Sequence, residues 1–162
     1  RLQQPGPGVQ KNRRYDRAIA DYSEAIRLNP RHASAFNNRG LVYENQRRYG
    51  RAIADYSRAI SLAPRFSHAL NNLAWLLATS KSGKHRDGTT AVQLAERAFS
   101  LSNDVAHLDT LAAAFAETGD FTAAVRAQRR AIGLLRRNGK NGELADFQTR
   151  LNLYRQEKPY RR

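Results

Sequence analysis

A near-exact repeat with a period of 34 residues constrains this chain more than any other feature. Residues 15–30 read YDRAIADYSEAIRLNP, and residues 49–64 read YGRAIADYSRAISLAP. A fixed period of this length is typical of a stack of similar supersecondary units rather than a domain with one enclosed site. Function in such a stack lies on an extended surface, so the default role of the chain is to hold another molecule.

Composition narrows the class of protein further. The 162 residues include no cysteine, which excludes disulfides, thiol catalysis and thiolate metal sites. No apolar run approaches the ~20 residues of a membrane span, so we expect a soluble chain of unknown compartment, with the cytoplasm favoured. Methionine is absent and the chain opens with Arg1; we therefore expect a fragment or processed form, which leaves open an upstream module with its own activity.

The net charge is strongly positive and unevenly spread. There are 28 Lys and Arg residues against 14 Asp and Glu residues, a formal charge of +14. The excess lies in residues 1–32 and 126–162, whereas the centre is close to neutral. Such a field favours anionic partners without identifying them.

Hydrophobic periodicity and turn residues predict a series of short helices. They cover residues 15–28, 33–46, 49–62, 67–79, 90–101, 104–117, 121–137 and 143–156. Pro5, Gly6, Pro7 and Gly8 predict a disordered lead-in over residues 1–11. Thr90 with Gln93 resembles a capping box that opens helix 90–101.

These helices group into repeats of unequal length. We expect an array over residues 12–137: a half repeat 12–30, then repeats 31–64, 65–103 and 104–137. The third unit contains an enlarged loop, 80–89. Residues 138–162 form a C-terminal capping helix and tail, as is common where the last repeat would otherwise expose its apolar side.

The small, aromatic and proline positions of this pattern resemble the tetratricopeptide repeat. Small residues recur where paired helices cross, aromatic residues lie beside them, and Pro30 and Pro64 close the first two units. The small positions are Gly40, Ala52, Ala59, Ala74, Ala91, Ala98, Ala112, Ala124 and Ala131; the aromatic ones are Phe36, Tyr43, Tyr56 and Phe115. The resemblance implies an all-α, right-handed superhelix of antiparallel helix pairs. Segments 71–80, 86–88, 108–121 and 153–161 are similar to the C-terminal ends of Planctomycetes-like bacterial repeat proteins.

The resemblance also implies a non-catalytic protein–protein interaction scaffold that holds an extended peptide on the concave side of its first helices. The positions predicted to line this groove are Asn37, Asn38, Leu41, His68, Asn71, Asn72, Trp75, Asp109 and Thr110. The repeated Asn-Asn pair favours binding over a merely solvated face, because an amide offers a peptide backbone both a donor and an acceptor. Trp75 is the only tryptophan. Its position fits two roles equally, an aromatic anchor in the groove or a side chain that fills the seam between repeats.

Two other interpretations stay open. Helix 121–137 places five arginines in one sector: Arg126, Arg129, Arg130, Arg136 and Arg137. Such a basic face suits an anionic protein partner. It suits nucleic acid less well, because no aromatic residues alternate with the arginines. Helix 15–28 lacks its partner helix, so the chain is also expected to self-associate there. The four histidines show no metal-ligand spacing and no catalytic motif is complete, so we expect no enzyme activity, cofactor or metal.

Overall fold

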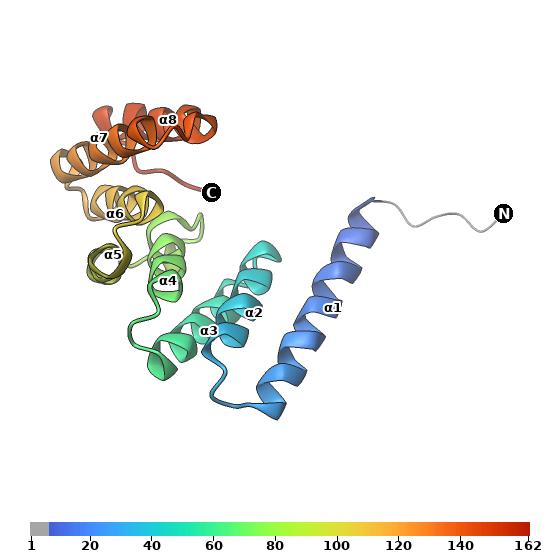
Figure 1. Cartoon of the computed structure of the whole chain (residues 1–162). Helices are drawn as coiled ribbons and strands as arrows, with labels where there is room; N and C mark the ends of the chain where they lie inside the picture. The colour runs from blue at the N-terminus through green and yellow to red at the C-terminus, as the bar shows by residue number, and fades with distance from the viewer. Residues whose placement is uncertain (1–6) are drawn as a thin grey trace. The chain divides into compact units, whose positions relative to one another are not determined.

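The computed structural model describes residues 7–162, which are helical apart from turns and loops. The chain divides into two compact units, Arg1–Pro64 and Arg65–Arg162. Figure 1 shows the order of the helices along the chain. The expected all-α architecture of antiparallel helix pairs is confirmed.

Unit 1 contains α1 (Pro7–Leu28), α2 (Ala33–Asn45) and α3 (Tyr49–Leu62), and α2 packs against both neighbours. The expected lead-in 1–11 is only partly testable, because residues 1–6 lie outside the described residues. From residue 7 onward the chain is helical, which corrects the expected start at residue 15. Proline is tolerated in the first turn of a helix, where its missing N–H would have no partner in any case.

The apolar stripe of α1 is half-buried against the rest of unit 1. Tyr15, Ile19, Tyr22 and Ile26 all keep part of their side chains exposed. Self-association through α1 stays a prediction.

The crossing of α2 and α3 depends on a glycine. A Cβ atom built on Gly40 would lie 2.8 Å from Cε1 of Tyr56 and 3.4 Å from the carbonyl oxygen of Ala52. The Tyr56 ring is fully buried, and its hydroxyl donates to Oε2 of Glu44 at 2.5 Å. The ring is thus held from both sides, and only a residue without a side chain lets the two helices approach this closely.

Gly40→Ala is expected to lower the free energy of unfolding by about 1–3 kcal/mol, because the added methyl overpacks a fixed ring. Gly50→Ala in α3 is the matched control, since nothing lies within 4 Å of its added Cβ. The control is expected to be neutral or to stabilise by up to about 1 kcal/mol, the helix propensity of alanine over glycine. Urea unfolding followed by far-UV circular dichroism measures both; equal effects would show that the close approach at Gly40 is absent.

Unit 2 contains five α-helices and a buried apolar core. They are α4 (Ser67–Thr79), α5 (Gly88–Ser102), α6 (Val105–Thr118), α7 (Phe121–Arg137) and α8 (Leu144–Arg155), with short 3-10 turns at Gly83–His85 and Asn141–Glu143. Successive helices pack on one another, and α4 also packs on α6. The core joins α6, α7 and α8 through Val105, Leu108, Ala131, Ile132, Leu135, Phe147 and Leu151.

The start of α5 differs from the sequence prediction. Its N-cap is Asp87, whose carboxylate accepts from the backbone N–H of Thr90 at 3.0 Å and from the Thr90 hydroxyl at 2.6 Å. The expected capping box opening at Thr90 is therefore wrong, because Asp87 supplies the cap three residues earlier. Both hydrogen bonds lower the pKa of Asp87, the hydroxyl bond most.

The enlarged loop before α5 is tied to α6. Arg86 pairs with Glu117 at 3.0 Å, and its Nη1 donates to the carbonyl oxygens of Ser80 and Lys81. The loop is thus fixed at the C-terminal end of α6, where Glu117 lies.

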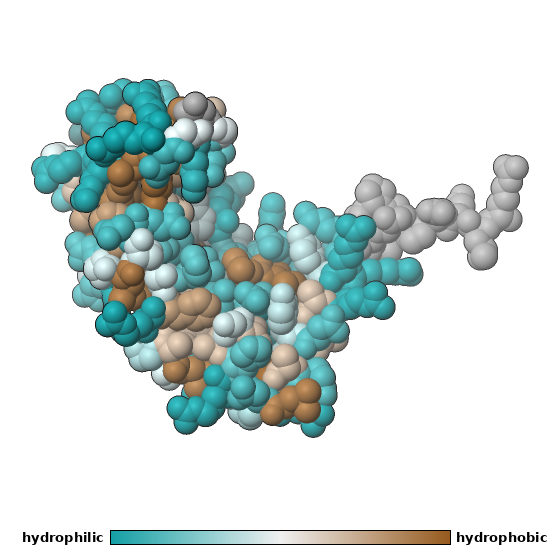
Figure 2. All heavy atoms as spheres, viewed as in Figure 1, coloured by the Kyte–Doolittle hydropathy of each residue, from teal (hydrophilic) through white to brown (hydrophobic). Residues whose placement is uncertain are grey.

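Hydrophilic residues cover most of the face shown in Figure 2, with small hydrophobic areas between them. Within residues 7–162, no helix combines the length and the apolar character needed to cross a bilayer.

Candidate functional site

The outward face of α2 carries a narrow stripe of predicted groove residues. At 100° per residue, Asn38, Leu41 and Asn45 fall within about 60° of one another. Leu41 is 38% exposed, one of two large hydrophobic residues left open to solvent among the described residues of unit 1. Asn37 lies at the edge of the stripe and is only 5% exposed, and its Nδ2 donates to Oδ1 of Asn38 at 3.2 Å. Asn37 therefore orients its neighbour rather than facing solvent.

The stripe ends at a polar pocket. A cavity of about 500 Å³ lies where the N-terminal half of α1 meets the end of α2. Asn45 lines it together with Lys11, Asn12, Tyr15, Asp16, Gln46, Arg47 and Arg48. A ligand lying along α2 would thus reach a hollow with both charged and amide side chains.

The equivalent face of α4 has the same stripe, but the chain itself covers part of it. His68, Asn72 and Trp75 share one sector of the helix, and Asn71 is half-buried at its edge. After α8 the chain runs back to the end of α4 without regular structure (Figure 1), and the backbone N–H of Arg162 donates to the carbonyl oxygen of Thr79 at 3.0 Å. We call residues 158–162 the return segment.

Three side-chain contacts hold the return segment beside α4 and α6. Nη1 of Arg161 donates to the carbonyl oxygen of Ala78 at 3.2 Å, and Nη2 forms an ion pair with Glu117. The Tyr160 ring lies on Trp75 with 5.8 Å between centroids. The face expected to bind a partner's segment therefore holds a segment of this chain.

Trp75 belongs to a cluster of rings and guanidinium groups. The Arg150 guanidinium lies 5.7 Å from the Trp75 centroid, 4.8 Å from that of Phe147 and 5.5 Å from that of Tyr160. The Arg162 guanidinium lies 5.5 Å from Trp75. Such cation–π contacts favour a fixed ring position. Trp75 thus keeps a partly exposed ring that already contacts one aromatic ring and two guanidinium groups.

Asp109 and Thr110 lie beneath this surface. Asp109 is 6% exposed, and its Oδ1 accepts from Nε of Arg150 at 2.8 Å and from Nε2 of Gln128 at 2.7 Å. Burial raises the pKa of Asp109, while Arg150 and Gln128 act in the opposite direction. The Thr110 hydroxyl donates to the carbonyl oxygen of Ala106, and the residue is 2% exposed. Neither side chain faces solvent, so neither belongs to the binding surface proposed below.

His68 is exposed and lies against a buried histidine. Its ring centroid is 6.1 Å from that of His107, whose Nδ1 is 2.8 Å from the Ser102 hydroxyl and 3.1 Å from the Ala98 carbonyl oxygen. Burial lowers the pKa of His107, which favours its neutral form. His68 is therefore the solvent-facing member of this pair.

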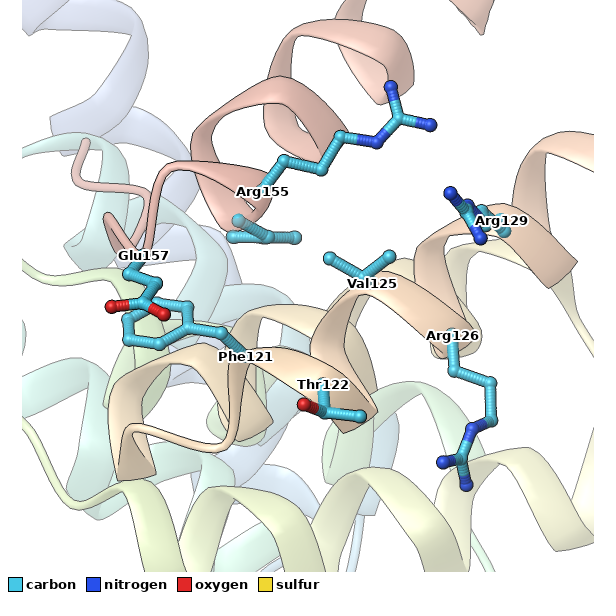
Figure 3. A pocket seen from close by; sticks show the side chains of 8 residues that line it. Phe121, Thr122, Val125, Arg126, Arg129, Arg155 and Glu157 are labelled. Carbon is cyan, nitrogen blue, oxygen red and sulfur yellow. The ribbon is translucent and has the colours of Figure 1, made fainter.

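The arginines of α7 do not act as one stripe. Arg126, Arg129 and Arg136 line pockets between α7 and α8, whereas Arg130 lies over the Phe99 ring at 5.1 Å. Figure 3 shows Arg129 from α7 and Arg155 from α8 extending on either side of Val125, with Arg126 pointing away from Arg155. Sequence reasoning grouped five arginines of one helix; the structure divides them and adds Arg155.

Four residues that contact the α4 face were missed from the sequence: Arg150, Tyr160, Arg161 and Arg162. The only signal for those in the return segment is the aromatic–arginine composition of the last residues, PYRR, which does not indicate where the segment packs. Its destination lies about 80 residues earlier in the chain, as the Arg161–Ala78 bond shows.

Comparison with known proteins agrees with this architecture. A family model described as tetratricopeptide repeat matches residues 8–65 and 43–104, more than half of the chain together. Among 59 similar chains of solved structure is the crystal structure of MamA, which covers 96% of this chain and 96% of its own, with a TM-score of 0.64 and 14% identity. At that identity the likeness concerns the fold alone. The search of curated proteins gives no match.

The general expectation of a binding scaffold follows from these findings. The helix pairs, the period and the family match support a protein–protein interaction scaffold in general. The chain belongs to the tetratricopeptide repeat family.

Proposed function

We propose that this chain is a non-catalytic scaffold that holds an extended segment of a partner protein on the outward faces of its first helices. In unit 1 that face is the α2 stripe of Asn38, Leu41 and Asn45. In unit 2 it is the α4 face of His68, Asn72 and Trp75, which becomes available when the return segment leaves.

One observation carries this proposal: the α4 face already receives a segment without regular structure. That segment uses the contacts expected of a bound peptide, namely a backbone N–H to Thr79, an aromatic ring on Trp75 and an arginine on Glu117. A face that accommodates one such segment has the shape and the polar groups to accommodate another.

The α2 stripe supports the proposal independently. Asn38 offers an amide that pairs with a backbone of any sequence, and Leu41 offers an exposed apolar contact one turn away. Exposed apolar surface beside convergent polar groups is typical of recognition sites. Backbone pairing would supply affinity, and Leu41 would select an apolar side chain.

Selection of peptides from a random library against the full-length chain tests this function. We expect the selected peptides to bind an Asn38→Ala, Leu41→Ser variant at least about tenfold more weakly, since an amide hydrogen bond and an apolar contact are each worth about 1 kcal/mol. The matched control is Ser57→Ala with Arg58→Ala, two exposed residues on α3 of the same unit. Selected peptides that bind the stripe variant as tightly as the control would remove the α2 face from the proposal.

A further inference from the structure

Within unit 2, a furrow between α7 and α8 is lined by other residues than the α4 face. Its first part is a pocket of about 460 Å³ with Phe121 and Val125 on its floor, and its second is a pocket of about 420 Å³ lined by Ile132, Gly133 and Leu151. Arg129 and Arg155 line both pockets, so the two are neighbours along the seam between α7 and α8. The α7 bank from residue 121 to 136 is about 22 Å long at 1.5 Å per residue.

The rim of the furrow is cationic and lacks ion pairs. Arg129, Arg136 and Arg155 form no salt bridge within the described part of the chain. Glu157 is the only acidic residue among the lining side chains, at the end away from Arg136. Figure 3 shows Arg129 on α7 and Arg155 on α8, with the apolar side chain of Val125 near both.

The repeat pattern within unit 2 indicates what kind of element fits beside α8. There α4 packs with α5, and α6 packs with α7. α8 follows as the first helix of a further unit and packs on α7. Among the described residues, no second helix pairs with α8. In each of these pairs an α-helix is the element that packs against the first helix.

We infer that this furrow binds an acidic amphipathic helix of a partner protein. The apolar floor takes the helix's hydrophobic stripe, and its flanking carboxylates pair with Arg129, Arg136 and Arg155, which arginine favours through paired N–H donors. A helix of about 15 residues matches the length of the furrow. Nucleic acid fits less well, because Tyr154 is fully buried and only Phe121 offers a ring for base stacking.

Fluorescence anisotropy with three labelled probes tests the inference on the full-length chain. The probes are an 18-residue Glu/Leu peptide with leucines at i, i+3, i+4 and i+7, a scrambled peptide of the same composition, and a 20-nucleotide single-stranded DNA. We expect the amphipathic peptide to bind at least about tenfold more tightly than the scrambled one, because only the former presents one apolar stripe. Equal binding of the two peptides, or tighter binding of the DNA, would overturn the inference.

Charge-matched variants locate the binding. Arg129→Ala with Arg155→Ala is expected to weaken the amphipathic peptide at least about tenfold, since two charge-assisted contacts are lost. Arg130→Ala with Arg137→Ala removes the same charge from α7 outside the furrow and should change affinity less than about twofold. Equal losses in both variants would show an unspecific effect of net charge and refute a built site.

A steric variant separates docking from attraction at a distance. Gly133 lies in the furrow, and nothing lies within 4 Å of a Cβ atom added there. Gly133→Leu should fill the furrow and weaken the peptide at least about tenfold without changing charge, by blocking its apolar floor. Gly50→Leu, equally open but in unit 1, is the control. Unchanged binding to Gly133→Leu would place the peptide elsewhere.

Discussion

Replacing Arg150 by methionine is expected to lower the free energy of unfolding by about 3–5 kcal/mol, the usual cost of removing one partner of a buried ion pair. Nε of Arg150 lies 2.8 Å from Oδ1 of Asp109, and the two side chains are only 11% and 9% exposed. Arg150 also stacks on Trp75, Phe147 and Tyr160. Without it, a buried carboxylate keeps only the amide of Gln128.

The same variant should recover stability in acid. Burial already raises the pKa of Asp109, and the loss of a neighbouring cation raises it further. A carboxyl whose folded pKa exceeds its unfolded value, ~3.9, binds more protons when folded, so stability increases as the pH falls through the folded pKa toward that value. The deficit of Arg150→Met relative to wild type is therefore expected to shrink as pH is lowered toward about 4.

Two further variants isolate the ion pair. Arg155→Met changes an exposed arginine of the same helix and should stay within about 0.5 kcal/mol of wild type. Asp109→Asn combined with Arg150→Met removes both charges and should recover part of the loss, because no uncompensated charge remains. Urea unfolding followed by Trp75 fluorescence measures all three. If Arg150→Met and Arg155→Met behaved alike, the ion pair would not join α6 to α8.

The sequence predicted the helices well because their signals are local. The limits of α4 and α7 coincide with the predicted ranges 67–79 and 121–137. In each case an unbroken apolar stripe ends at polar or glycine-containing turns, and no distant contact is needed to fix the limits. The missed cap at Asp87 is a local error between two candidate capping residues that lie three positions apart.

The binding surface was harder to predict because burial depends on distant partners. The repeat register predicts that Asp109 lies on the same outward face as Asn72. In the structure its carboxylate is held inside the unit by Gln128 and by Arg150, which lies 41 residues later in the chain. The return segment likewise has no periodicity, so nothing local indicates that it lies on α4. Register identifies which helix face is outward; it does not reveal what else of the chain packs there.

Releasing the return segment is expected to open the α4 face to ligands. In the full-length Tyr160→Ser, Arg161→Ser variant, the ring on Trp75 and the ion pair to Glu117 are both lost. Trp75 is the only tryptophan, so its emission should shift to longer wavelength as the indole becomes hydrated. Its spectrum therefore reports directly whether the segment is bound.

A peptide with the sequence of residues 156–162, QEKPYRR, measures the competition. A covalently attached segment has an effective concentration of about 1 mM, so a free peptide with a Kd of about 100 µM should bind the released variant about tenfold more tightly than wild type. Gln156→Ser with Lys158→Ser alters exposed residues of the same region and should leave both the Trp75 spectrum and the peptide affinity at wild-type values.

The two readouts together decide whether the α4 face is held closed by the chain itself. Tighter peptide binding with a shifted Trp75 spectrum means that the return segment and an external peptide use the same contacts, so a partner must displace the segment before it binds unit 2. Equal peptide affinity in wild type and the released variant would contradict that exclusion. In that case the return segment would be a structural clasp on α4, and the α2 stripe would be the remaining face for an extended ligand.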